Sequence, residues 1–364
     1  MEYINRHKEI IMKIAFCKFA GMANGGAEKY LQTIAIIFKK NGHDVDYYYT
    51  NSAPLANTTW IHPDNDPNRI ELLKRYGINL IYVNVERRIE GDWINSNFFE
   101  KFDESKYEFL VTAGGGESEY PYNILKNIKI IHTIHGDRVH NQNNIYKAIL
   151  LCNWQANRWV NNGGDVSKLE IIPSVVYVPE KYTNSFRDKY NIPIDSFVYG
   201  FHQRNDETIS STVSLEAYRE IQNDNTYMMI LGATEVHKSY VNNKGLKNVI
   251  YVDYTSDVNE INDFLEGIDV YTHCRKDGEV CSACIIEAMA HKKPIVSYPG
   301  SNLGHVEQLE NCGKITYSIE EYNDEMLKLM DIDYYNIISN KTKEKYNTVY
   351  KYSIVEEKIL NLIK

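Results

Sequence analysis

The sequence of 364 residues has no run that approaches the roughly 20 apolar residues of a membrane-spanning helix. Its polar start, residues 1–9, does not resemble a signal peptide. Its 40 basic side chains are outnumbered by 49 acidic ones, which argues against a broad surface for nucleic acid. We therefore expect a cytoplasmic protein with no integral membrane segment and no nucleic-acid partner, which leaves peripheral contact with a membrane open.

Cysteine is too sparse and too irregularly spaced for a disulfide framework or a zinc site. Of the six cysteines, Cys281 and Cys284 form a C-x2-C pair, and Cys274 lies seven positions before Cys281. A structural zinc site needs a second pair or a nearby pair of histidines. We predict buried, reduced thiols and no metal, as is usual for a cytosolic protein.

Expected strands and helices alternate along the first half of the chain. A buried run at 10–17 is followed by a Gly-containing loop and by Leu31, Ile34, Ala35 and Phe38 at helical spacing. Alternation of this kind predicts a parallel, doubly wound sheet, in which ligands bind beyond the carboxyl ends of the strands. The other expected strands of this half are 44–49, 79–85, 109–112, 129–135 and 148–152.

A second alternating series follows a polar stretch that contains Pro173, Pro179 and Pro193. The chain is long for one hydrophobic core, so we expect two Rossmann-like domains. The predicted organisation is a first domain at 1–175, a linker at 176–195, a second domain at 196–345 and a C-terminal helix within 346–364. The expected elements of the second series are strands at 197–201, 227–231, 249–252, 269–273 and 294–297, and helices at 208–221 and 257–265.

The segment 279–297 contains two carboxylates, Glu279 and Glu287, eight positions apart with small residues between them. On one unbroken helix they would be roughly 12 Å apart, so a shared ligand requires a loop at Glu279 and a helix at Glu287. The start of that helix would present N–H donors near Ser282 and Ala283, which suit phosphate. Carboxylates suit sugar hydroxyls, so the pattern favours a sugar linked to a nucleoside diphosphate. By spacing alone, two solvated acids on an ordinary amphipathic helix remain an alternative.

The same segment resembles the donor-binding signature of retaining glycosyltransferases of family 4 (glycosyl transferases group 1). It has the E-x7-E spacing, an E-A-M-A helix and a Pro-Ile-Val strand, and a Gly25-Gly26-Ala27-Glu28 segment stands near the other end of the chain. The resemblance implies the GT-B fold, two Rossmann-like domains with a cleft between them. It further implies that the last helix crosses back to the first domain.

The resemblance also implies roles for individual residues. Glu279 would contact the donor sugar and Glu287 the ribose hydroxyls. The backbone of Cys281, Ser282 and Ala283 would face the diphosphate. In the first domain Gly25 and Gly26 would approach the diphosphate closely, and His135 would contact the sugar.

Arg204, which follows the first strand of the second domain, matches the diphosphate-binding arginine of the family. Relatives usually have a lysine five or six residues further on, where this chain has Ile209 and Ser210. One expected cation is therefore missing. Arg204 and the helix N-terminus would stabilise the leaving diphosphate without a metal. The lack of a D-x-D motif at an expected strand end agrees with this.

These observations predict a metal-independent, retaining glycosyltransferase that needs no cofactor besides its donor substrate. The catalytic residues would be Glu279, His135 and Arg204. The donor would be a UDP- or GDP-sugar, and the acceptor a hydroxyl of a glycan, a lipid or a protein-linked group. Two alternatives remain open: a nucleotide-sugar epimerase on the same scaffold, and a non-catalytic nucleotide-sugar-binding protein, which the missing lysine motivates.

Overall fold

The computed structural model describes residues 11–23, 25–50, 65–85, 87–89, 92–94, 96–116, 121–140, 142–178 and 186–364. Residues 179–185 of the expected linker lie outside this part. The chain divides into two compact units. Unit 1 contains 1–151, 155–172 and 356–364, and unit 2 contains 152–154 and 173–355.

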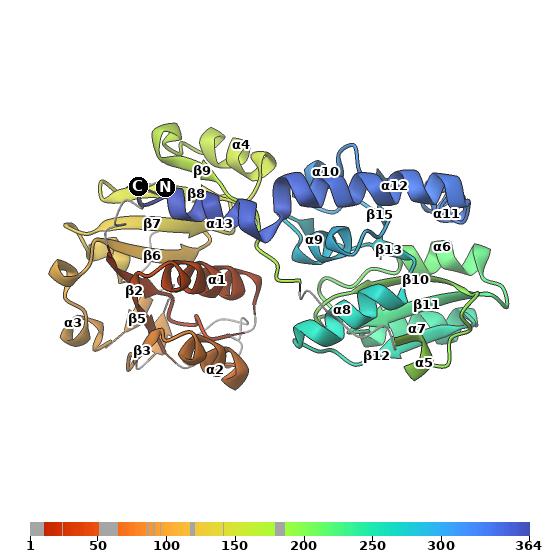
Figure 1. The fold of residues 1–364 in the computed structure, drawn as a ribbon, viewed down its shortest axis with the longest axis horizontal. Helices are drawn as coiled ribbons and strands as arrows, with labels where there is room; N and C mark the ends of the chain where they lie inside the picture. The colour runs from red at the N-terminus through yellow and green to blue at the C-terminus, as the bar shows by residue number, and fades with distance from the viewer. Residues whose placement is uncertain are drawn as a thin grey trace, which may run out of the picture. The chain divides into compact units, whose positions relative to one another are not determined.

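Within the described residues, unit 1 is built on a seven-stranded parallel sheet with the order β3-β2-β1-β6-β7-β8-β9 (Figure 1). The order reverses at β1, whose neighbours are β2 on one side and β6 on the other. The carboxyl ends of β1 and β6 therefore form the topological switch point of this sheet. The strands are β1 (Lys13–Cys17), β2 (Asp44–Tyr49), β3 (Asn79–Tyr82), β6 (Phe109–Gly114), β7 (Lys129–Ile134), β8 (Ile145–Leu150) and β9 (Leu169–Ile171).

The helices of unit 1 bury one apolar face. In α1 (Gly26–Lys40), Leu31, Ile34, Ala35 and Phe38 are fully buried, and the helix packs against β2 and β6. Glu28 in its first turn and Lys39 and Lys40 in its last complement the helix dipole. The other helices are α2 (Pro67–Arg75), α3 (Phe98–Lys101), α4 (Asn153–Asn161) and α13 (Tyr352–Asn361). Of these, α4 begins in unit 2 and α13 ends in unit 1. Two short strands, β4 (Arg87–Ile89) and β5 (Asp92–Ile94), form an antiparallel pair.

In its described residues, unit 2 has a six-stranded parallel sheet with the order β12-β11-β10-β13-β15-β17. Here the switch point lies between β10 and β13. The strands of this sheet are β10 (Phe197–His202), β11 (Thr226–Leu231), β12 (Val249–Val252), β13 (Val270–His273), β15 (Ile295–Ser297) and β17 (Lys314–Ile315). A separate short parallel pair consists of β14 (Gly278–Glu279) and β16 (Asn302–Leu303).

The helices of unit 2 include α9 (Ala283–Ala290), which follows the loop after β13 and is capped by the Ser282 side chain. The other helices are α5 (Phe186–Lys189), α6 (Val213–Ile221), α7 (Glu235–Lys244), α8 (Val258–Gly267), α10 (Gly304–Leu309), α11 (Ile319–Lys328), α12 (Ile332–Lys345) and a π-helical turn at Tyr346–Tyr350.

The two parallel α/β sheets confirm the predicted fold class, but one predicted helix was placed wrongly. Residues 208–212 are not helical, and α6 begins only at Val213. The reason is local: the Asp206 carboxylate accepts hydrogen bonds from the Thr208 N–H (3.0 Å) and the Thr208 hydroxyl (2.6 Å), which stabilises a turn.

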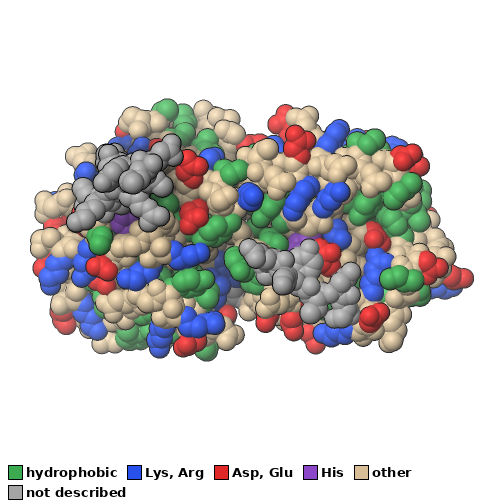
Figure 2. Space-filling model, viewed as in Figure 1, with side chains coloured by type: hydrophobic (Ala, Val, Ile, Leu, Met, Phe, Trp, Pro, Cys, Tyr) green, Lys and Arg blue, Asp and Glu red, His purple; other side chains and the backbone are tan. Residues whose placement is uncertain are grey.

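No helix in the described ranges is both long and apolar enough to cross a membrane. On the face shown in Figure 2, acidic and basic side chains are interspersed over both units.

Candidate donor site

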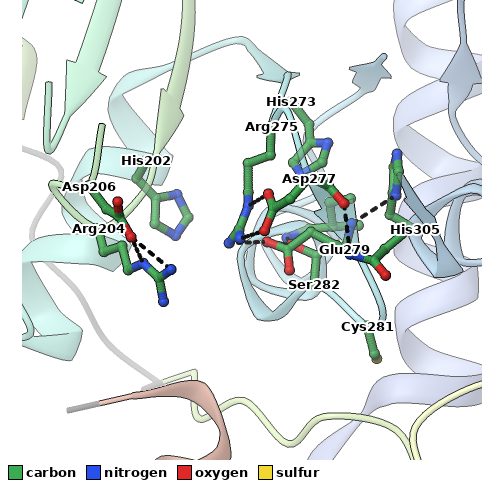
Figure 3. Close-up of polar contacts among 12 residues, drawn as sticks. His202, Arg204, Asp206, His273, Arg275, Asp277, Glu279, Cys281, Ser282 and His305 are labelled. Atoms are coloured by element: carbon green, nitrogen blue, oxygen red, sulfur yellow. Dashed lines mark hydrogen bonds and ion pairs between the residues drawn. The ribbon is translucent and has the colours of Figure 1, made fainter. Parts of the chain in front are cut away.

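Arg204 and Arg275 occupy equivalent places at the switch point of unit 2. Arg204 stands two residues after β10, and Arg275 stands two residues after β13, the strand that neighbours β10. The carboxyl ends of neighbouring parallel strands share one sheet edge, which brings the two guanidinium groups to the same region (Figure 3). The sequence prediction had assigned a role to Arg204 alone.

The Arg204 side chain is held by a neighbouring carboxylate and stays accessible. Its Nε donates to Asp206 Oδ2 at 2.9 Å, and 58% of the side chain is exposed. The positions of the missing lysine are buried instead: Ile209 is in the core, and the Ser210 hydroxyl contacts Thr234 Oγ1 at 2.9 Å. The structure thus places no cation at 209 or 210.

Arg275 connects the two carboxylates that follow it (Figure 3). Its Nη1 donates to Glu279 Oε1 at 2.9 Å, while Nε and Nη2 bind both oxygens of Asp277 at 2.9 and 2.6 Å. Burial alone would lower the pKa of Arg275, but the charges of Glu279 and Asp277 outweigh burial and the pKa is raised. Burial raises the pKa of Glu279, with Arg275 acting against it.

Besides Arg275, contacts from α9 and α10 fix the position of Glu279. Its N–H donates to His305 Nδ1 on α10 at 3.2 Å, and its Oε1 accepts a bond of 3.4 Å from the Ser282 hydroxyl at the start of α9. The other ring nitrogen of His305 donates to the Tyr298 carbonyl at 3.2 Å. The carboxylate is therefore preorganised before any ligand binds.

The start of α9 differs from the prediction in one respect. The Ser282 N–H was expected to face the diphosphate, but it donates to Gln308 Oε1 at 2.7 Å. In the described part of the chain, the N–H groups of Ala283 and Cys284 have no such acceptor, and Ala283 is exposed. No acidic residue stands in the first turn of α9. The donors that suit an anion thus begin one residue later than predicted.

The Cys281 side chain has a packing role, whereas its backbone was predicted to bind the donor. Its sulfur accepts hydrogen bonds from the Ser174 N–H and from Gln308 Nε2, both at 3.4 Å, and its carbonyl accepts from the Ser174 hydroxyl at 3.1 Å. Burial raises the pKa of the Cys281 thiol to about 12. The thiol and carbonyl are therefore unavailable to a ligand.

Glu287, on α9, contacts the last residue of β10. Glu287 Oε2 lies 2.8 Å from His202 Nε2, and Oε1 remains for other donors. Burial alone would lower the pKa of His202, but Cys284 and Glu287 outweigh burial and raise it to about 10. The sequence prediction missed His202 because nothing in its own segment indicates a contact with α9.

In unit 1 the start of α1 already has a carboxylate of its own. The Glu28 side chain folds back against Gly25, where a Cβ would collide with it, and it forms an ion pair of 3.4 Å with Lys18. A Cβ at Gly26 would meet open space. The group nearest to Gly25 is therefore the flexible end of the Glu28 side chain, and the roles predicted for Gly25 and Gly26 in donor binding stay predictions.

His135 follows β7 in unit 1, and its N–H donates to the Gly114 carbonyl at 2.9 Å. Its ring meets Tyr30 edge to face, and its Nε2 atom is buried without a hydrogen-bond partner among the described residues. Burial, with Lys18 adding to it, lowers the pKa of His135 to about 3. The imidazole is therefore neutral near pH 7. Its predicted contact with the sugar stays a prediction.

Residues 183–345 match the family model of glycosyl transferases group 1. The chain is a glycosyltransferase that contains a domain of family 4. No curated protein sequence shows significant similarity to this chain.

Solved structures show that this glycosyltransferase has the GT-B fold. A glycosyltransferase from Rickettsia africae is similar, with a TM-score of 0.74, 17% identity and coverage of 97% of this chain and 98% of that one. The Anabaena protein HepE, solved in complex with UDP and glucose, has a TM-score of 0.71, 14% identity and coverage of 96% and 98%. Sucrose-phosphate synthase from Thermosynechococcus elongatus has a TM-score of 0.68, 14% identity and coverage of 96% and 98%.

Proposed function

We propose that this glycosyltransferase uses a nucleoside diphosphate sugar as its donor and transfers the sugar to an acceptor hydroxyl. The observation that supports this most directly is the group of side chains at the switch point of unit 2. Two guanidinium groups and a helix start free of acidic residues suit a diphosphate, and Glu279 and Glu287 suit hydroxyl donors. The likeness to HepE, which was solved with UDP-glucose, agrees with this donor class.

The role that we propose for each residue follows from its contacts in the structure. Arg204 and the N–H groups of Ala283 and Cys284 bind the diphosphate, and Arg275 adds positive charge while it holds Glu279. Glu287 Oε1 accepts from the ribose hydroxyls, and Glu279 accepts from the donor sugar. Negative charge grows on the diphosphate as the sugar leaves, so cations fixed in advance lower the barrier.

The family resemblance also assigns donor contacts to Gly25, Gly26 and His135 of unit 1. A neutral His135 can exchange hydrogen bonds with sugar hydroxyls without adding charge. Retention of the anomeric configuration rests on the family resemblance. Independence from a metal rests on the two arginines and the start of α9, which supply the positive charge that a divalent cation would supply.

The donor is best identified by thermal shift with UDP, GDP, ADP and their glucose conjugates, because a ligand that binds only the folded state raises the melting temperature. One nucleotide should stabilise the wild type. Glu287→Gln should weaken its binding by about 1–3 kcal/mol, since the ribose hydroxyls lose a charged acceptor. The control is Glu260→Gln, an exposed carboxylate on α8, which should bind like wild type. Equal affinity in Glu287→Gln would remove this residue from the ribose role.

Turnover is then tested with the stabilising donor in the presence of EDTA. Release of the nucleoside diphosphate should depend on an added acceptor and survive chelation, and NMR of the product should show the anomeric configuration of the donor. Loss of activity that magnesium or manganese restores would contradict the role of the two arginines. An epimerised sugar formed without acceptor would support the epimerase alternative.

A further inference from the structure

Three side chains of different chemistry converge where β10 meets α9. They are His202 at the end of β10, and Cys284 and Glu287, which stand three residues apart on one face of α9. One nitrogen, one sulfur and one oxygen from these residues all lie within 4.8 Å of one another. His202 Nε2 and Glu287 Oε2 are already 2.8 Å apart.

The His202 ring is fixed by its surroundings rather than by a full set of hydrogen bonds. It packs edge-on against Tyr271, with ring centroids 5.5 Å apart, and against Phe264 at 5.9 Å. Its Nδ1 atom is buried and has no hydrogen-bond partner among the described residues. Packing therefore orients the ring, and its Nε2 atom makes the polar contact with Glu287 on α9.

Imidazole nitrogen, thiolate sulfur and carboxylate oxygen are the ligands that Zn²⁺ prefers, and three protein ligands leave a fourth tetrahedral position open. Magnesium prefers an octahedral set of oxygens, which this group lacks. We propose that His202, Cys284 and Glu287 bind one thiophilic divalent cation, with Zn²⁺ the best fit. On binding, the Cys284 thiol and the Nε2–H group of His202 each lose a proton to solvent. Bonds from the metal to sulfur, nitrogen and oxygen then replace the hydrogen bond between His202 and Glu287.

A consequence follows for the enzyme, and it rests on the proposed function. Zinc bound through Glu287 Oε2 would withdraw negative charge from the carboxylate whose Oε1 accepts the ribose hydroxyls. Zinc and the donor nucleotide should therefore weaken each other's binding, which makes the metal an inhibitor that EDTA removes. The site thus differs from a catalytic metal centre, in which chelation would lower activity.

The site is tested first on the wild-type protein by alkylation with iodoacetamide and mass spectrometry. Cys284 is the one cysteine of the six, all in described residues, that is not buried, so it should react first. Buffered free Zn²⁺ should protect it, and Mg²⁺ should not. Alkylation at an equal rate with and without Zn²⁺ would overturn the proposal.

Affinity is then measured by competition with a chromophoric chelator, and cobalt is used as a spectroscopic probe. The wild type should bind one Zn²⁺ per chain, and bound Co²⁺ should show a thiolate charge-transfer band. Loss of a side chain that only hydrogen-bonds to a metal ligand lowers metal affinity about ten- to hundredfold. Cys284→Ser removes a ligand itself, so it should lower the zinc affinity by more than this. The matched control is Cys281→Ser, whose sulfur contacts Ser174 and Gln308 instead, and it should keep the band. A band that persists in Cys284→Ser would refute the assignment.

The link to the donor is measured separately, by titrating the cognate nucleoside diphosphate into the protein at fixed free Zn²⁺. The nucleotide should lower the apparent zinc affinity in proportion to its own saturation. If zinc binds through Cys284 but the nucleotide leaves its affinity unchanged, the metal site stands and the ribose role of Glu287 is refuted. If zinc fails to bind while the nucleotide binds through Glu287, the proposed function stands and this inference is refuted.

Discussion

The switch points of the two sheets have the same topology but differ in the charges at the helix starts beside them. In each sheet the strand order reverses at the first strand of the unit, between β1 and β6 in unit 1 and between β10 and β13 in unit 2. In unit 1, α1 begins with Glu28, which folds onto the helix start and pairs with Lys18. In unit 2, α9 begins without an acid, and Arg204 and Arg275 stand at the neighbouring strand ends.

His202 of unit 2 differs from the histidines of unit 1 in the same sense, whereas burial lowers the pKa of His273 at the end of β13. Burial lowers the pKa of His132 and that of His135 to about 3, so both rings in unit 1 are neutral near pH 7. In unit 2, neighbouring Cys284 and Glu287 overcome burial and raise the pKa of His202 to about 10. A helix N-terminus attracts an anionic ligand more strongly where no side-chain carboxylate of the protein already lies beside it. The comparison therefore supports the proposal that the diphosphate binds at α9, and it favours a structural role for the charges around α1.

The largest effect is expected from Arg275→Met, which removes the cation between Asp277 and Glu279. Two partly buried carboxylates would then face each other without a counter-ion, which should lower the free energy of unfolding by about 3–5 kcal/mol. Turnover should also fall, because Glu279 loses its fixed orientation. Urea unfolding and steady-state kinetics measure both. Arg219→Ala, an exposed arginine on α6 paired with Glu220, serves as the control. Wild-type stability in Arg275→Met would show that Asp277 and Glu279 need no shared cation.

Arg204→Ala tests the accessible cation of the same pair. Its side chain is largely exposed, so stability should change by less than about 0.5 kcal/mol. Since the leaving group gains charge in the transition state, kcat/KM should fall about a hundredfold or more, with kcat affected more than donor affinity. Arg204→Lys should recover part of the loss, because a point charge replaces a planar fork. Turnover at the wild-type rate in Arg204→Ala would place the diphosphate away from this strand end.

The neutral histidines of unit 1 predict a dependence of stability on pH. The pKa of buried His132 is lowered to about 3, against about 6.5 in an unfolded chain, so the unfolded state binds the additional proton between these values. The stability is fully present above pH 6.5 and is lost as pH falls towards 3, by about 2 kcal/mol at pH 5 for this one group. His132→Asn should remove that part of the loss, as hydrogen exchange of β7 at pH 5 and 7.5 can measure. An undiminished pH dependence in the variant would mean that the ring is not held neutral.

The sequence predicted the strands and the motif residues, which local patterns encode. It missed the contacts between residues that only the folded sheet brings together. Buried runs gave the strands, and the resemblance indicated Arg204 and Glu287. Arg275, within Arg-Lys-Asp, has no local signal except its place two residues after a strand, which mirrors that of Arg204. The contact between His202 and α9 depends on the pairing of β10 with β13, because that pairing brings α9 to the end of β10. The Gln308 side chain that occupies the Ser282 N–H comes from α10, whose position no local rule predicts.

The smallest expected effect comes from making the start of α9 resemble that of α1. Ala283 is exposed and is the first residue of α9, so Ala283→Glu would place a carboxylate in the first turn of α9, as Glu28 does in α1. The new charge should stabilise the helix by about 0.3–1 kcal/mol and compete with a diphosphate for the same N–H groups. We expect donor affinity to fall about tenfold, equivalent to about 1.4 kcal/mol, and the loss to shrink at high salt as the charges are screened. Ala283→Gln, with the same shape but no charge, should bind the donor like wild type. If both variants lose affinity equally, the side chain blocks the donor sterically and the electrostatic comparison between α1 and α9 fails.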